Sequence, residues 1–527
     1  MRKITYFRGA NLWILLTGLG VCVAALFVQA QHLRFVCDDA FISFRYARNL
    51  AQGHGLVFNP GERVEGYTSL LWILLLTPLE ALQLDMTVAA VWLGWGAAAA
   101  TLLLAFAVGF QRSSRPGLLC LMAPALLGSS RIFGGWASGG LETSLYGLLL
   151  LLAVALAARE GDTGKAPVAS SLCFAALALT RPEGIMAWGI CASLTFARKL
   201  RPTHALLGGL LFGLPTLAHL SFRMAYYGEL LPNTFHAKFG GFQWSTGLGY
   251  IWGWMEAYGG YLVLPMALFA GFRPARPTRP LLPRMLLGVV LANLFYLAAI
   301  GGDFYEFRFI APLLAPLALL VQEALLTLHA AGRLRWAVPP LAVGVLALTL
   351  RPTFTGYHPP PGSTAPDANI EHERDLVTHR WRPIATWLER FARPDESIAL
   401  GAVGVIPYYS RLRTVDVHGL TDRAIARGPV VNPGLIGHLR EASQEYLLTR
   451  RQVTYLIHLM PVPVRNPRRI CVEMAHGQAL CFDTNLPRDS FARRLLQRGA
   501  RLTAPTAEDL RAADTDPESP NPHGVHR

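Results

Sequence analysis

Long apolar stretches separated by short polar loops dominate the first two-thirds of the chain. The first stretch covers residues 10–30 and follows three basic residues. We expect a retained membrane span with its N-terminus on the cytoplasmic side, because about 20 apolar residues cross a bilayer as a helix and basic residues stay inside. A cleaved signal peptide is the alternative, since residues 28–30 read Val-Gln-Ala, which is compatible with a cleavage site.

The next apolar stretch, residues 70–84, is ambiguous because it contains Pro78 and Glu80. It has about 15 residues, whereas a full span needs roughly 17 or more. We predict a helix that lies in the outer interface without crossing. The charge pattern agrees with this choice, because it leaves Arg112 and Arg115 on the cytoplasmic side, where the positive-inside rule puts them.

About eleven spans are predicted in this way. After residues 10–30 they cover residues 87–110, 117–133, 141–158, 166–181, 184–199, 204–222, 259–272, 283–300, 308–328 and 334–350. The loops on the predicted cytoplasmic side then carry the clusters of Arg and Lys. The opposite, outer loops carry acids, aromatic residues and single basic residues, so we expect the chemistry on the outer side.

The pattern changes after residue 350. Residues 351–373 read as a Pro-rich linker, and the region after them shows helical spacing at 374–391, strand patterns at 398–409, 414–418 and 453–459, and a helix near 435–450. The prediction is a polytopic α-helical membrane protein, residues 1–350 with a first outer loop over 32–86, joined to a small extracytoplasmic α/β domain over 374–505. The polar tail, 506–527, is predicted to be disordered.

Composition agrees with a membrane protein. The 527 residues are 52% hydrophobic and only 16% charged, whereas soluble domains are nearer a quarter charged. The formal charge of +14 is explained by membrane topology, so no nucleic-acid partner is expected. There are seven cysteines and no Cys-x-x-Cys pair; Cys471 and Cys481 could form a disulfide if that region lies outside the cytoplasm.

The first outer loop carries the densest polar chemistry. Adjacent acids, Asp38 and Asp39, follow the first span, and glycines and a proline further along supply tight turns. Acids beside a span are often solvated anchors, but an ordered polar loop favours an active-site element. A carboxylate there could take a proton from an acceptor hydroxyl or stabilise positive charge at a sugar ring. We predict Asp38 and Asp39 as the catalytic residues.

Other residues of the outer loops extend this candidate site. Acids at span ends are often structural, and basic residues there often reach only for the interface. A lipid-linked phosphate, however, needs cations at that depth, for which Arg offers bidentate contacts and Lys a point charge. The candidate substrate- and phosphate-binding residues are Arg45, Glu65, Tyr67, Glu142, Arg181, Asn233, His236, Lys238, Asp303 and Arg308.

Nucleotide-binding and metal-binding motifs bear on possible cofactors. Gly401 and Gly404 suggest a nucleotide-binding loop, but the third glycine is missing and the pattern runs into Ile-Pro-Tyr-Tyr instead of a helix, so a strand and turn are favoured. A His-Glu-x-x-His motif and a Cys/His cluster are both absent from the sequence. A divalent cation held by aspartates stays open, and no other cofactor is predicted.

The segment DDAFISFRYARNLAQGHGLVFNPGERVEGYTSLLW resembles the first outer loop of the GT-C membrane glycosyltransferases. It is most similar to the branch that contains the actinobacterial terminal arabinofuranosyltransferases. GLET, LTRPEG, ELLPNTFHAK, GGDFYEFRF and GAVGVIPYYSRLRTVDVHGLTD resemble the same branch in the same order, so the likeness spans most of the chain.

The resemblance implies transfer of a sugar, with arabinofuranose the first candidate, from a polyprenyl-phosphate donor to an extracytoplasmic glycan or glycolipid of the cell envelope. It implies a bacterial inner-membrane protein whose catalytic aspartate matches Asp38 or Asp39. It also supports the interfacial assignment of residues 70–84. Two other classes stay open: a transporter or flippase for a lipid-linked glycan, and a non-catalytic scaffold for envelope assembly.

Overall fold

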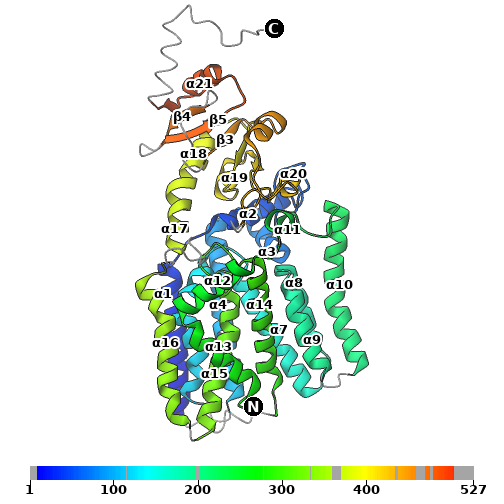
Figure 1. Ribbon diagram of the computed structural model, residues 1–527, viewed down its shortest axis with the longest axis vertical. Coiled ribbons are helices and arrows are strands. Elements are labelled where there is room, and N and C mark those ends of the chain that lie inside the picture. Colours follow the sequence, from blue (N-terminus) through cyan, green and yellow to red (C-terminus); the bar gives the residue numbers. More distant parts are fainter. Residues whose placement is uncertain are drawn as a thin grey trace, which may run out of the picture.

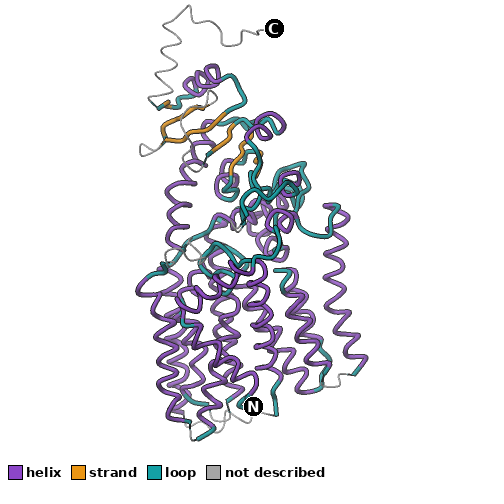
Figure 2. The backbone as a smooth tube through the Cα atoms, in the orientation of Figure 1, coloured by secondary structure: helices purple, strands orange, loops and turns teal. Residues whose placement is uncertain are grey.

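A computed structural model of the chain shows a bundle of long, nearly parallel helices with a smaller strand-containing domain at one end (Figures 1 and 2). We call this end of the bundle the domain end and the opposite one the far end. The structure describes residues 9–113, 116–197, 201–276, 278–332, 334–358, 369–433, 437–458, 469–474 and 479–503. The predicted tail, 506–527, and residues 359–368 of the predicted linker lie outside these residues.

The first part of the chain consists mainly of helices, which include the predicted apolar stretches and further helices between them. They are α1 (Gly9–His32), α2 (Asp38–Ala51), α3 (Leu70–Ala81), α4 (Met86–Arg112), α5 (Met122–Ser129), α6 (Arg131–Ser138), α7 (Thr143–Thr163), α8 (Val168–Thr180), α9 (Gly184–Phe196), α10 (Pro202–Tyr227), α11 (Asn233–Lys238), α12 (Trp244–Tyr258), α13 (Gly260–Phe272), α14 (Leu281–Ile300), α15 (Leu314–Ala330) and α16 (Val338–Thr355).

The chain is a multi-pass membrane protein. Among the described residues, seven helices are long and apolar enough to cross a membrane, and the pair Leu118–Ser129 and Arg131–Ser138, bent by 54°, can form an eighth span. Every predicted span corresponds to a helix. The predicted total of about eleven is not established, because α8, α9 and α13 are apolar helices of 13 residues each, shorter than the roughly 17 that a full span needs.

Helix α3 begins and ends on the same side of the bundle. Near its C-terminal end, Glu80 accepts a hydrogen bond from Arg48 of α2 at 2.6 Å and another from the Tyr408 hydroxyl at 3.2 Å. Both partners belong to the layer between the bundle and the C-terminal domain, where Figure 1 also shows α2 and α11. With 12 residues, α3 is shorter than the roughly 17 that a full span needs, and its position in the membrane interface stays a prediction.

The far end of the bundle is held by a buried ion pair. Arg112, in the last turn of α4, bonds Glu323 of α15 at 2.5 Å and donates to the main-chain oxygen of Arg279 at 2.6 Å. Glu323 also accepts the backbone N–H of Ala275 at 3.0 Å. Two loops that were predicted to be cytoplasmic, those after α4 and after α13, therefore meet beside α15 at the far end of the bundle.

The C-terminal domain contains a mixed six-stranded sheet with the strand order β2-β1-β3-β5-β4-β6. The first three of these strands are parallel and the others antiparallel. Its elements are α17 (Ile370–Asp375), a π-helical segment (Leu376–Trp381), α18 (Arg382–Phe391), β1 (Ser397–Leu400), α19 (Val405–Ser410), β2 (Arg413–Asp416), α20 (Arg423–Ala426), a second π-helical segment (Tyr446–Arg450), β3 (Tyr455–Ile457), β4 (Arg469–Glu473), β5 (Ala479–Asp483), α21 (Arg488–Gln497) and β6 (Arg501–Leu502).

Two sequence predictions for this domain were wrong in detail, and two strands were missed. The strand predicted over 398–409 ends at Leu400, and the short helix α19 follows it. A helix was predicted near residues 435–450, but the structure has only the short π-helical segment Tyr446–Arg450 and the residues just before it. Residues 434–436 lie outside the described part. Strands β4 and β5 were missed, although Cys471 and Cys481 face each other across them and form a disulfide. Their alternating pattern is short, so it carried little signal.

Candidate active site

The two adjacent aspartates at the start of α2 have different environments. The carboxylate of Asp38 accepts the backbone N–H groups of Gly404 at 2.9 Å and Val405 at 2.7 Å, and its side chain is 5% exposed. Burial raises the pKa of Asp38 to about 8, with a further increase from the nearby Glu373. Asp38 therefore clamps the C-terminal domain to the bundle, and its carboxylate oxygens are directed at main-chain N–H groups.

The same contact explains Gly404, whose motif was predicted to be a strand and turn. A helix does follow it, and the N–H groups at the start of α19 point at a carboxylate of the same chain. A methyl group on Gly404 would overlap the main-chain oxygen of Asp38. This glycine is needed for close packing, and the side chain that its N–H faces is that of Asp38.

Asp39, in contrast, is the aspartate available for chemistry. Its side chain is 25% exposed, and it bonds Arg308 at 3.1 Å. Burial acts to raise the pKa of Asp39, but the positive charges of Lys238 and Arg308 outweigh it and hold that pKa below its usual value. Asp39 is therefore an ionised carboxylate with a solvent-accessible edge.

The loop between α14 and α15 supplies the main cation. Asp303 holds Arg308 with two hydrogen bonds, 2.7 Å to Nε and 3.2 Å to Nη2, which leaves Nη1 directed at Asp39. Phe307 has a φ of 43°, which is uncommon for a residue with a bulky side chain. Aromatic rings around Phe307, including Tyr258 at 5.7 Å, pack against it and hold this conformation.

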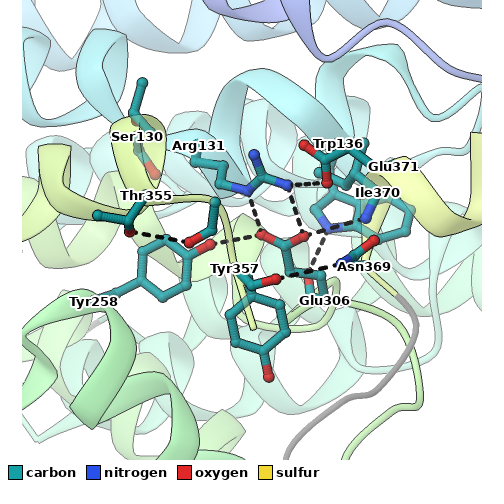
Figure 3. Close-up of polar contacts among 12 residues, drawn as sticks. Ser130, Arg131, Trp136, Tyr258, Glu306, Thr355, Tyr357, Asn369, Ile370 and Glu371 are labelled. Carbon is teal, nitrogen blue, oxygen red and sulfur yellow. Dashed lines mark hydrogen bonds and ion pairs between the residues drawn. The ribbon is translucent and has the colours of Figure 1, made fainter. Parts of the chain in front are cut away.

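Glu306, on the same loop, is the centre of a buried polar cluster (Figure 3). Its carboxylate accepts from Arg131 at 2.8 Å, from the Tyr258 hydroxyl at 2.7 Å and from the backbone N–H of Ile370 at 3.2 Å. Glu306 is 0% and Arg131 2% exposed. Arg131 also pairs with Glu371. The cluster ties α6, α12 and α17 to the loop that carries Arg308.

The sequence contains two indications of this cluster. Arg131 falls inside the predicted span 117–133, and charged residues within a span are generally paired and functional. Glu306 lies within the motif GGDFYEFRF. What the sequence alone did not indicate is that the two residues are partners.

Arg181 lies beside Arg308 but is largely neutralised. It bonds Glu142 at 3.0 Å and Glu183 at 3.0 Å. The guanidinium groups of Arg181 and Arg308 both contact the ring of Phe309, at 4.7 and 5.0 Å from its centroid. The predicted residues Arg181 and Glu142 are therefore brought to the site, where they form its wall next to the Arg308 guanidinium.

The remaining cation, Lys238, comes from α11. It is exposed, and it has neither a hydrogen bond nor an ion pair with any residue in the part of the chain that the structure describes. Its charge nevertheless acts on Asp39. The C-terminal domain adds His438, whose charge also acts on Asp39 and whose ring lies 5.3 Å from that of Phe304. Sequence reasoning missed His438, because nothing in its local pattern places it near α2.

The other predicted residues brace the surroundings of the site. Glu65 bonds Arg223 of α10 at 2.7 Å, and the hydroxyls of Tyr67 and Tyr227 lie 3.1 Å apart. Asn233 donates to the main-chain oxygens of Gly419 and Leu420 in the C-terminal domain. These contacts join the first outer loop, α10 and α11 to one another and to the domain.

Two predicted binding residues point elsewhere. Arg45 donates to the main-chain oxygens of Phe58, Pro407 and Leu412 and to Asn59, and it is 5% exposed. Its donors are used within the fold, so Arg45 is a brace between α2 and the C-terminal domain. The ring of His236 lies 3.9 Å from the carboxylate of Glu229.

The sequence left open a divalent cation held by aspartates. In the described residues, groups of three or more His, Cys, Asp or Glu side chains arranged to hold a metal ion are not found. Asp39 and Asp303 direct carboxylate oxygens at the Arg308 guanidinium, which uses these oxygens as hydrogen-bond acceptors.

The comparisons with known proteins agree with this architecture. A structure of ArnT from Cupriavidus metallidurans bound to undecaprenyl phosphate is 14% identical, has a TM-score of 0.52 and covers 91% of this chain and 99% of that chain. At this identity the likeness shows that the two chains share a fold. A family model described as a domain of unknown function (DUF8728) matches residues 368–501.

Two sequence relatives carry the same name, terminal beta-(1->2)-arabinofuranosyltransferase. The one from Corynebacterium glutamicum is 28% identical over 369 residues, which are 62% of this chain and 53% of that protein. The one from Mycobacterium tuberculosis is 29% identical over 369 residues, which are 58% of this chain and 55% of that protein. The chain thus spans about half the length of these relatives. The resemblance to this branch of the GT-C glycosyltransferases is confirmed.

Proposed function

We propose that this chain is a membrane glycosyltransferase that moves a sugar from a polyprenyl-phosphate donor to an extracytoplasmic glycan or glycolipid of the cell envelope. Arabinofuranose is the first candidate for the sugar, because both sequence relatives are named for its transfer. The solved ArnT structure binds undecaprenyl phosphate, which supports a lipid-linked donor. The bacterial inner membrane, with the site on its outer face, is the proposed location.

The observation that carries the proposal is the arrangement of Asp39, Arg308 and Lys238. A partly exposed carboxylate lies 3.1 Å from a guanidinium that Asp303 orients, and an exposed ammonium group acts on the same carboxylate. Asp39 is suited to take the proton of the acceptor hydroxyl. The two cations are suited to hold the donor phosphate and to balance its charge as it leaves.

Asp38 is given a different role from the one that the sequence alone suggested. Its two backbone hydrogen bonds and its burial support a structural clamp. Asp39 is therefore proposed as the catalytic carboxylate of the pair.

The test is transfer of labelled sugar from polyprenyl-phosphate arabinose by the purified full-length protein. We expect Asp39→Asn to lose about 10²- to 10⁴-fold in rate, with little change in melting temperature, because Arg308 keeps Asp303. Asp375→Asn is the matched control, since Asp375 is 72% exposed and its only ion pair in the described structure is with His379. Transfer by Asp39→Asn at the parent's rate would contradict the assignment.

The transporter alternative predicts a different result. A flippase would move the labelled lipid across vesicles without breaking the bond between sugar and phosphate. Vesicle transport by the parent with no released polyprenyl phosphate would favour it. A scaffold would show neither activity, although it would bind the envelope glycan.

A further inference from the structure

A groove lined by three arginines lies next to the contact between Asp38 and Val405. It has a volume of about 360 Å³, and its walls come from the α1–α2 connection, α2, α4 and the helices α17 to α19. Its lining residues are Arg34, Phe35, Val36, Phe41, Thr87, Arg374, Val377, Thr378, Arg382, Val405 and Tyr409. None of these is Asp39, Lys238, Arg308 or His438, so the groove is distinct from the candidate active site.

Three arginines surround this groove, and all three are exposed. Arg34 has no side-chain hydrogen bond among the described residues, Arg374 makes one long bond of 3.4 Å to the main-chain oxygen of His32, and Arg382 lies 3.2 Å above the ring of Tyr409. Within the part of the chain that the structure describes, none of the three forms an ion pair with a carboxylate. The groove therefore carries three positive charges that are not held in ion pairs among the described residues, although the charges of Arg382 and Arg374 act on the nearby carboxylates of Asp85 and Glu371.

The floor of the groove is apolar and lies at the level where the bundle ends. Phe41 and Val405 form part of the floor, and Thr87 is in the first turn of α4. Exposed apolar side chains continue along the bundle from there, with Val28 one turn before the end of α1 and Trp92 in the second turn of α4, 71% and 61% exposed. A lipid with an anionic head could place its phosphate between the arginines and its chain along α1 and α4.

We propose that this groove binds a phosphate-bearing lipid headgroup, separately from the donor site. The charge complementarity is direct, since arginine binds phosphate through paired N–H donors. Basic side chains near a membrane surface each strengthen binding of anionic lipid about fivefold. Because Val405 both lines the groove and donates its N–H to Asp38, a bound headgroup would contact the clamp that docks the C-terminal domain.

The test uses the full-length protein in detergent, with phosphatidylglycerol or phosphatidylcholine added and bound lipid counted by native mass spectrometry. The parent should retain phosphatidylglycerol in preference to phosphatidylcholine. Arg34→Gln/Arg382→Gln should weaken that retention about twenty- to thirty-fold, from two contributions of about fivefold. Arg390→Gln is the matched control, because Arg390 is an exposed residue of α18 that stacks on Phe391 and does not line the groove.

Arg34→Gln alone is not expected to disturb folding, because the Arg34 side chain has no hydrogen-bond or ion-pair partner among the described residues. This single variant should weaken retention of phosphatidylglycerol about fivefold. Millimolar inorganic phosphate separates the two sources of the ligand. If phosphate displaces the lipid, the groove recognises the phosphate group itself; if it does not, the lipid chain is required as well. Equal retention of phosphatidylglycerol by the parent, Arg34→Gln and the double variant would overturn the proposal.

Discussion

Glu306→Leu removes the acceptor at the centre of the buried cluster and leaves Arg131 inside the bundle. Glu306 is 0% and Arg131 2% exposed, so the charge that stays behind has little access to water. Removing one partner of a buried ion pair typically costs about 3–5 kcal/mol. The Tyr258 hydroxyl and the Ile370 N–H also lose their acceptor, at about 1–3 kcal/mol each.

One contact offsets part of this loss. Glu371, whose side chain is 41% exposed, still accepts from Arg131 and can follow it toward water. We therefore expect a net destabilisation near the low end of the combined range, about 5 kcal/mol, or a fall in melting temperature on the order of 5 °C for a chain of this size. Arg413→Met is the control, because Arg413 is 43% exposed and its ion pair with Glu62 is at the surface, where such pairs contribute about 1 kcal/mol or less.

The assay is thermal unfolding of the detergent-solubilised protein, followed by a double variant. Arg131→Met/Glu306→Leu removes both charges, and replacing a buried ion pair with apolar side chains of similar size is often close to neutral. We expect the double variant to melt above Glu306→Leu. If it melts below that single variant, the destabilisation does not come from an unpaired charge and the reasoning is refuted.

Three further predictions concern the C-terminal domain. Gly404→Ala should expose this domain to proteolysis, because the added methyl group overlaps the main chain of Asp38, whereas Gly209→Ala should not, since nothing lies within 4 Å of the position of its added carbon. Burial raises the pKa of Asp38 from 3.8 to about 8, so between these two pH values the folded state keeps a proton that the unfolded state releases. The melting temperature should therefore fall as the pH rises from about 4 to about 8, and it should fall less steeply in Asp38→Asn. Reducing the Cys471–Cys481 disulfide, which links residues ten apart in the chain, should cost the domain roughly 2–3 kcal/mol, measured by melting with and without reductant.

Hydropathy by itself determined most of the helical architecture. A helix that faces lipid must carry a long apolar stretch, and this signal is local, so each predicted span corresponds to a helix. The short length of residues 70–84 likewise predicted a helix that does not cross, and the structure places α3 at the domain end. The number of complete spans was not determined, because α8, α9 and α13 are too short for length alone to decide.

The first outer loop was also singled out from the sequence, because its two adjacent acids lie in a polar loop whose glycines and proline indicate ordered turns. Which of the two is available for chemistry was not readable. Neighbouring residues of a helix point about 100° apart, so their surroundings depend on what packs against each side. Asp38 meets the N–H groups of Gly404 and Val405, more than 360 positions away, and Asp39 meets Arg308.

The dependence on distant partners also applies to the other predicted site residues. Residue type and motif brought Arg181, Lys238, Asp303 and Arg308 into the candidate site, because a phosphate-binding site needs charges at span ends. Only the tertiary structure showed that Arg45 is used within the fold and that His438 lies near Asp39. The function of a charged side chain is set by its partners. These lie far apart in the chain, and local sequence carries no record of them.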